Sequence, residues 1–335
     1  MTVYLYGMPG KVGGAATKIA HLLQLLHRQI HFKLILPTGH SKIPKETSAF
    51  LKKKGIVWCY RQDVPITKHD VVLAICERRF FSSGSALKLK ELGYRIVWSN
   101  EMMWPFDGEK EAVESGIVDR VLWVSQFQAR AFAEIYRTIP SLVTGNYIDP
   151  NDYCWKKREN EQLTLGRLSR ADPAKYPANF PQFYEALEID QARYRVMAWT
   201  NEVAKQYRFH HFGPAWDLLK PNKVSALDFL YSLDLFVYPL GHRVKESWGR
   251  AVVEAMLTGC PPIVPHGHQF HELMVHGESG FICDEFTQWK SCVQELAYNY
   301  RKRLKFSRTA SDYARETHCR AEVHRELWMN ALTFK

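Results

Sequence analysis

The sequence has no long apolar run, and this absence excludes a membrane-spanning helix. No segment approaches the roughly 20 uninterrupted apolar residues that cross a bilayer. The first residues, "MTVYLYGMPGKVGG", contain only a short apolar run with no basic stretch before it, unlike a signal peptide. We therefore expect residues 3–7 to form the first strand of the fold, and we expect the protein to be cytoplasmic.

The cysteines also lack a pattern. The 335 residues include seven cysteines, an odd number, and no two of them are spaced as C-x-x-C. Disulfide frameworks and structural zinc sites normally show paired, regularly spaced cysteines. We expect reduced and mostly packed thiols, with no metal site.

The glycine-rich stretch "GMPGKVGGAATK" (7–18) lacks the signature of a P-loop, which is G-x-x-x-x-G-K-[ST]. The second expected strand, "FKLILP" (32–37), is not followed by an acid, which disfavours a dinucleotide-dependent oxidoreductase. Two adjacent glycines before a helix still let a ligand approach the backbone, and the helix N-terminus favours an anion. A tight turn without a ligand is the alternative.

Negative charge is scarce in the first half of the chain. The net charge is +10; residues 1–158 hold 23 Lys and Arg against 14 Asp and Glu (23 − 14 = +9), and residues 159–335 hold 22 against 21 (+1). Such asymmetry indicates an anionic partner for the first half, or it serves only solubility.

Short apolar runs alternate with helical patterns in both halves, which predicts two α/β domains with parallel sheets. A polar, turn-rich segment at 146–161 reads as the linker between them. The expected strands are 3–7, 32–37, 70–76, 95–99, 120–125, 163–167, 193–199, 210–213, 233–239 and 261–265. The expected helices are 17–29, 224–232, 248–258 and 286–304. We predict two Rossmann-like domains that face each other across a cleft.

Two segments of the second half combine charge with strand ends. In "LGRLSRADPAKY" (165–176), Arg167 ends a strand and Lys175 follows eight residues later. Strand ends of an α/β sheet point into the ligand crevice, where both cations suit a phosphate; a solvated basic loop is the alternative.

The second segment is "ESWGRAVVE" (246–254). Ser247 is placed to cap a helix that Gly259 ends. Glu246 precedes this helix and Glu254 lies about two turns inside it, both toward the same crevice.

The two acids reproduce E-x7-E, and the chain resembles the GT-B glycosyltransferases, in particular the retaining group called family 4. "EAMLTGCPPIVPHGHQFHELMVHGESGF" (254–281) resembles the segment that follows this motif in the family. Further matches are the "GG" loop, "VLWVSQF" (121–127), "TGNYIDPNDY" (144–153) and "GRLSRADPAK". The resemblance extends over about residues 1–285.

The resemblance implies an acceptor-binding domain at 1–155, a donor-binding domain at 156–312, and a last helix at 313–335 that crosses back to the first domain. It implies that Arg167 and Lys175 neutralise the diphosphate of a nucleotide sugar. Glu246 would contact the transferred sugar and act with these cations as the catalytic group, while Glu254 would bind the ribose.

The remaining site residues also follow from the resemblance. Gly14 would let its loop approach the diphosphate, and Ser247, Trp248 and Gly249 would present backbone N–H groups to the donor. On the acceptor side, Asn100 and Glu101 stand where many members of the family have a histidine. The strand end at 210–216 would receive the base.

The activity that the resemblance implies is transfer of a hexose, with retention of configuration, from a UDP- or GDP-sugar to an acceptor hydroxyl. No cofactor and no metal are expected, because side chains and helix dipoles neutralise the leaving group. A glycan or lipid-linked acceptor at the inner membrane face is one expectation. DNA with hydroxymethylated bases, or a nucleotide-sugar-binding protein without transfer activity, are the alternatives.

Overall fold

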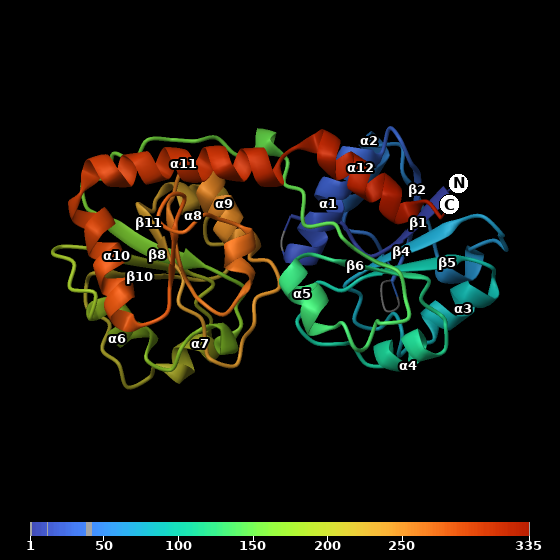
Figure 1. The fold of residues 1–335 in the computed structure, drawn as a ribbon, viewed down its shortest axis with the longest axis horizontal. Helices are drawn as coiled ribbons and strands as arrows, with labels where there is room; N and C mark the ends of the chain where they lie inside the picture. The colour runs from blue at the N-terminus through green and yellow to red at the C-terminus, as the bar shows by residue number, and fades with distance from the viewer. Residues whose placement is uncertain (1, 12, 38–41, 335) are drawn as a thin grey trace. The chain divides into compact units, whose positions relative to one another are not determined.

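The computed structural model describes residues 2–11, 13–37 and 42–334 (Figure 1). The chain forms two compact units, Met1–Asp149 with Arg320–Lys335, and Pro150–Cys319. Each unit is built on one parallel β-sheet, as the sequence predicts. Val12 of the glycine-rich loop and residues 38–41 after the second strand lie outside the described residues, so the expectations there are not assessed.

The sheet of the first unit has seven strands in the order β3-β2-β1-β4-β5-β6-β7, and every neighbouring pair is parallel. The strands are β1 (Thr2–Tyr6), β2 (His31–Ile35), β3 (Val57–Cys59), β4 (Val71–Ile75), β5 (Arg95–Ser99), β6 (Arg120–Trp123) and β7 (Ser141–Val143). Strands β1 and β4 are buried almost throughout. The order reverses between β1 and β4, which makes their carboxyl ends the expected ligand edge of this sheet.

Helices cover both faces of the first sheet. They are α1 (Gly14–Leu26), α2 (Lys45–Lys53), α3 (Ser85–Glu91), α4 (Glu109–Glu114), α5 (Gln126–Ala131) and α12 (Ala321–Leu332), with a 3₁₀ turn at Arg61–Asp63. The last helix, α12, lies beside α1 (Figure 1), and its Trp328 is buried in the same apolar core. Arg120 donates to the carbonyl oxygens of Asn330 and Ala331 at 2.9 and 2.7 Å. These contacts anchor the end of the chain in the first unit.

The sheet of the second unit has six strands in the order β10-β9-β8-β11-β12-β13, again all parallel. The strands are β8 (Thr164–Leu168), β9 (Arg193–Met197), β10 (Trp216–Leu219), β11 (Leu235–Val237), β12 (Pro262–Pro265) and β13 (Phe281–Cys283). The order reverses between β8 and β11. The predicted strand at 210–213 is wrong, because that segment is a loop and the strand begins at Trp216.

The helices of the second unit are α6 (Phe180–Glu185), α7 (Asn201–Gln206), α8 (Ala226–Tyr231), α9 (Arg250–Thr258), α10 (Phe286–Tyr298) and α11 (Tyr300–His318). There are 3₁₀ turns at Pro150–Asp152, Pro173–Lys175 and Gln269–Glu272. The single helix predicted at 286–304 is two helices. Asn299 separates them, because its side chain accepts from the N–H of Lys302 and caps α11.

The seven cysteines are free; Cys260, Cys283 and Cys319 are buried, and Cys154 is exposed. Within the residues that the structure describes, no helix is both long and apolar enough to span a bilayer.

Candidate active site

The candidate donor site lies at the carboxyl ends of β8, β11 and β12, next to the reversal of strand order in the second unit. Arg167 lies in β8, and Lys175 ends the 3₁₀ turn that follows this strand. Tyr238 follows β11 directly, and His268 follows β12 after two residues. The sheet order makes these three strands neighbours, so residues far apart in sequence meet at one edge.

Lys175 and Glu246 form an ion pair at this edge. Lys175 Nζ lies 2.7 Å from Glu246 Oε2, and the two side chains are only 9% and 15% exposed. The hydroxyl of Tyr238 donates to the same carboxylate oxygen at 3.2 Å. The backbone N–H of Glu246 donates to His268 Nδ1 at 3.1 Å, which fixes the loop that carries the acid.

Burial and charge set the protonation of this cluster. Burial by itself lowers the pKa of Lys175, but the electrostatic effects of Tyr238 and Glu246 outweigh it, so the pKa is raised and the ammonium keeps its charge. Burial, followed by the positive charge of Lys245, lowers the pKa of His268 to about 4. His268 is therefore neutral near pH 7 and available as the acceptor of the Glu246 N–H.

Arg167 is placed differently from the sequence prediction. Its guanidinium is fully buried and donates to the carbonyl oxygens of Pro239 at 2.6 Å and Lys175 at 3.2 Å. The rings of Tyr176 and Tyr238 lie 4.3 and 4.7 Å from it, a geometry that supports cation–π attraction. In this geometry Arg167 holds the backbone of Pro239 and Lys175, and the phosphate contact expected for it stays a prediction.

The loops after β8 and β11 are packed too closely for a side chain at Gly241. A Cβ on this residue would lie 2.1 Å from the carbonyl oxygen of Ala174. The N–H of Gly241 donates to the carbonyl oxygen of Lys175 at 3.3 Å. A glycine is required here, and its contact holds the backbone of Lys175 in place.

Helix α9 begins two residues later than predicted. Its N-cap is Gly249, with φ 88° and no side-chain cap, so the predicted Ser247 cap is wrong. The N–H groups of Val252 and Val253 donate to the carbonyl oxygen of Gly249 at 2.9 and 3.4 Å, and those of Arg250 and Ala251 precede the first bond inside the helix. The ring of Trp248 is buried and lies 5.4 Å from that of His318 in α11. The Trp248 side chain therefore packs inside the unit.

Glu254 lies on α9 beside Arg250, whose Nη1 is 3.7 Å from Glu254 Oε1. Burial raises the pKa of Glu254, while Arg250 and a hydrogen bond from Tyr153 favour its ionised form. Helix α9 ends at Gly259 as predicted, and Val252, Val253, Met256 and Leu257 form its buried stripe. Glu246 and Glu254 thus occupy distinct environments, one beside Lys175 and the other beside Arg250.

In the first unit, Gly14 is the first residue of α1, and a Cβ on it would meet no atom within 4 Å. Lys18 lies one turn further along α1. Its Nζ is 2.6 Å from Glu101 Oε1 and 3.3 Å from Ser99 Oγ. Glu101 therefore lies in a buried ion pair at the carboxyl end of β5.

The amide of Asn100 is fully used inside the first unit. Its Nδ2 donates to the carbonyl oxygen of Trp104 and to Glu109, at 3.1 and 3.0 Å, and its Oδ1 accepts from the N–H of Met102. The side chain is also fully buried. Asn100 organises the loop after β5, and the predicted acceptor contact is not part of this geometry.

Three neighbours of the predicted acids were not predicted from the sequence, and these are Tyr238, His268 and Lys18. A signal existed for two of them, because Tyr238 and His268 follow expected strands at the edge where ligands bind. Glu77, which follows β4 at the carboxyl edge of the first sheet, was not predicted either. Burial raises the pKa of Glu77 to about 7.

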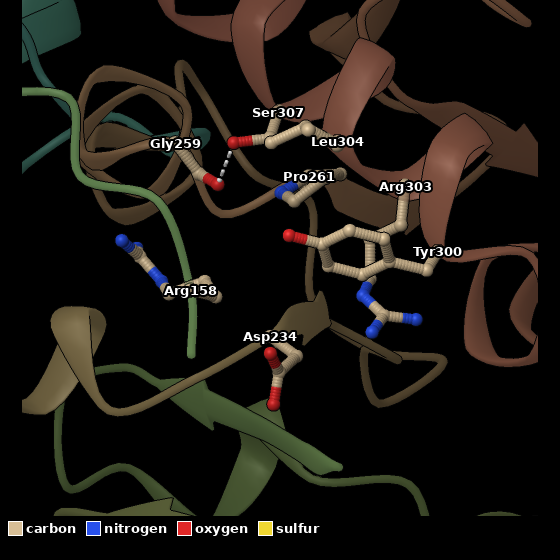
Figure 2. A pocket seen from close by; sticks show the side chains of 8 residues that line it. All are labelled: Arg158, Asp234, Gly259, Pro261, Tyr300, Arg303, Leu304 and Ser307. Carbon is tan, nitrogen blue, oxygen red and sulfur yellow. Dashed lines mark hydrogen bonds between the residues drawn. The ribbon is translucent and has the colours of Figure 1, made fainter. Parts of the chain in front are cut away.

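A small cavity of about 10 Å³ lies elsewhere in the second unit (Figure 2). Asp234 and Pro261 precede β11 and β12, so this cavity lies at the amino edge of the sheet, away from the candidate site. Arg158 donates to the carbonyl oxygens of Leu233 and Lys156, and Asp234 accepts from the N–H of Thr164. A cavity of this size holds about one water molecule, so it is unsuited to a sugar nucleotide.

The architecture matches that of GT-B glycosyltransferases of known structure. Anabaena HepE, in complex with UDP and glucose, is similar over 100% of both chains with a TM-score of 0.77 and 15% sequence identity. Sucrose-phosphate synthase from Thermosynechococcus elongatus is similar over 98% of both chains, with a TM-score of 0.72 and 11% identity. WaaB, a lipopolysaccharide outer core galactosyltransferase, has a TM-score of 0.71 over 99% of both chains and 13% identity. The predicted GT-B fold of two parallel-sheet α/β domains is confirmed.

The second unit also carries a family signature in its sequence. Residues 156–317 match the model of the family described as glycosyl transferases group 1. No curated protein matches the chain by sequence. The family match covers the second unit, and the similar structures show that the whole chain has the GT-B fold. Across the described part of the chain, no three His, Cys, Asp or Glu side chains are grouped so as to hold a metal ion.

Proposed function

We propose that this protein is a retaining, metal-independent glycosyltransferase that moves a hexose from a nucleoside diphosphate sugar to a hydroxyl of a glycan or lipid-linked acceptor. The observation that carries the proposal is the Lys175–Glu246 pair, 2.7 Å apart at the ligand edge of the second sheet. It lies inside the segment that matches glycosyl transferases group 1. UDP-glucose is the first donor to test, because HepE has been solved in complex with it.

In this proposal Lys175 stabilises the leaving diphosphate. As the bond between the anomeric carbon and the diphosphate oxygen breaks, negative charge grows on that oxygen. A held ammonium and the N-terminus of α9 stabilise this charge without a metal. Arg167 acts through Lys175 by holding its backbone carbonyl.

Glu246 is assigned to the transferred sugar. Its carboxylate accepts from Lys175 and Tyr238, and a carboxylate oxygen retains further capacity to accept from sugar hydroxyls. Glu254, with Arg250 and Tyr153 beside it, is assigned to the ribose hydroxyls. The acceptor oxygen bonds to the anomeric carbon on the face that the diphosphate leaves, and the acceptor proton passes to the diphosphate.

The donor class is tested by calorimetric titration of UDP, UDP-glucose, GDP-mannose and NAD. We expect a nucleotide sugar to bind, and NAD not to bind. Lys175→Met should weaken binding of the nucleoside diphosphate by about tenfold or more, because a charge-assisted contact is lost. The exposed Lys205 of the same unit supplies the matched control, Lys205→Met, which should leave binding unchanged. Binding of NAD without any nucleotide sugar would contradict the proposal.

The metal and stereochemical parts of the proposal are tested on the working enzyme. Turnover in excess EDTA should equal turnover without it, because no step uses a metal. Proton NMR of the first product formed should show the anomeric configuration of the donor. Loss of activity in EDTA that Mg²⁺ restores, or an inverted product, would contradict the respective part.

A further inference from the structure

The edge strand of the first sheet exposes apolar side chains to solvent. Strand β3 pairs only with β2 and ends the sheet. Trp58 in this strand and Tyr60 directly after it are 42 and 37% exposed, and we call these two residues the β3 patch. Natural edge strands usually carry charge or lie covered, so an exposed Trp and Tyr here need an explanation.

The aromatic side chains of the β3 patch contact each other. The rings of Trp58 and Tyr60 pack edge to face, with centroids 5.4 Å apart and planes at 89°. Rings that combine an apolar body with a polar N–H or O–H are favoured at the boundary between water and lipid. The patch therefore has the composition of an interfacial contact.

Cations precede the edge strand in the chain. Helix α2 ends in Lys52 and Lys53, both exposed, and Lys54 follows before β3 begins. Arg28, at the end of α1, is also close, since its charge and that of Lys53 act on Lys54. These four cations come from two adjacent elements of the first unit. Like charges gathered without a matching number of acids suit a polyanionic surface.

We propose that the β3 patch and the adjoining lysines bind the protein to an anionic lipid surface. The rings enter the headgroup region while the ammonium groups contact acidic headgroups. The exposed rings and the neighbouring cations thus make separate contacts with the same lipid surface. The inference concerns the first unit alone and does not rest on the proposed glycosyl transfer.

Two other occupants fit the patch less well. A second copy of the chain pairing through β3 would bring the same lysines together, and like charges at short range oppose that contact. A nucleic acid would use the lysines, but stacking of bases needs free ring faces. The edge-to-face contact covers one face of one ring.

The test is sedimentation of the full chain with vesicles. One vesicle is phosphatidylcholine alone and the other contains about 30% phosphatidylglycerol, at roughly 0.1 and 0.5 M NaCl. We expect binding only to the anionic vesicles, weakened by salt. Lys52→Glu with Lys53→Glu should weaken it by at least about tenfold, since each lysine contributes about fivefold. Trp58→Ser with Tyr60→Ser should also weaken it by about tenfold.

Matched controls come from the second unit, where Phe209, Lys220 and Lys223 are exposed. Phe209→Ser and the pair Lys220→Glu with Lys223→Glu should leave vesicle binding unchanged. Circular dichroism checks that each variant is folded. Absence of vesicle binding, or equal loss in the control variants, would overturn the proposal. So would a protein that binds duplex DNA or dimerises through the β3 patch and ignores vesicles. A protein that binds vesicles but no nucleotide sugar would retain this inference and lose the proposed function.

Discussion

A substitution at Gly14 should affect the stability of the protein and its activity in different ways. It is the first residue of α1, and a Cβ on it would meet nothing within 4 Å. Gly14→Ala should leave stability unchanged or raise it by up to about 1 kcal/mol, because alanine loses less backbone entropy in a helix. If the diphosphate approaches this backbone, the added methyl should lower turnover by about tenfold or more.

The two readouts for Gly14→Ala are the midpoint of urea unfolding and the initial rate of nucleoside diphosphate release. Gly13→Ala is the contrasting variant, because Gly13 has φ 89° and alanine is strained there by roughly 1 kcal/mol or more. Unchanged turnover in a stable Gly14→Ala protein would exclude Gly14 from the donor site.

Part of the candidate site could be predicted from the sequence. Glu246 and Lys175 were expected in one crevice, and they form a direct ion pair. Their roles toward a donor stay predictions. Arg167 and Asn100 were expected to face ligands, but they are fully buried and bonded to backbone. A sequence pattern places such residues at a strand end, yet it does not reveal whether a later loop, such as Pro239 or Trp104, takes up their hydrogen-bonding groups.

The stability of the protein depends on Arg250 in helix α9, because this cation offsets the charge of the buried Glu254. Arg250→Met should destabilise the protein by about 1–3 kcal/mol, because Glu254 would remain buried without its cation. Burial already raises the pKa of Glu254. With the folded-state pKa above the unfolded value, stability is greatest at low pH and falls as rising pH ionises the carboxyl. The loss should therefore be larger at pH 8 than at pH 4.5.

The test compares the free energies of unfolding in denaturant of Arg250→Met, Glu254→Gln and the double variant. The double variant should recover much of the stability, since it removes the uncompensated charge. Equal losses in the Arg250→Met protein at both pH values would show that Glu254 needs no counter-charge.

At the scale of elements, the sequence predicted the buried strands better than the exposed ones. Strand β4 is buried at every position and was expected at 70–76. Strand β10 is only half-buried and was placed too early, at 210–213. Its residues, "WDLL", do not form a continuous apolar run. Asn299 could have been recognised as a helix cap, but the similar apolar spacing on either side of it concealed the break between α10 and α11.

For the whole molecule, two buried histidines should limit acid stability. Burial lowers the pKa of His318 and of His268 to about 4. The unfolded chain takes up protons near pH 6.5, above the folded-state value, so stability is full above pH 6.5 and falls as the pH drops toward 4. His318, which lies against Trp248 and bonds to the carbonyl oxygen of Leu273, should contribute up to about 3 kcal/mol of this loss.

Calorimetric melting from pH 7.5 to pH 4 measures the acid effect. His318→Gln keeps a hydrogen-bond donor and does not titrate, so its stability should fall less steeply with acid than that of the unaltered protein. The exposed His211 supplies the control, His211→Gln, whose pH dependence should be unchanged. Identical slopes for the unaltered and His318→Gln proteins would show that the buried ring titrates like a free one.

The Lys175–Glu246 pair is proposed to serve the transfer of a sugar from a nucleotide. The most direct measurement is mass spectrometry of donor and acceptor mixtures, with release of nucleoside diphosphate followed in parallel. The unaltered protein should release diphosphate from one nucleotide sugar and add one hexose to an acceptor. Lys175→Met and Glu246→Gln should each lower the rate by about 10²–10³ while Lys205→Met does not. Turnover that survives both substitutions, or the absence of turnover with every nucleotide sugar, would contradict this role of the pair.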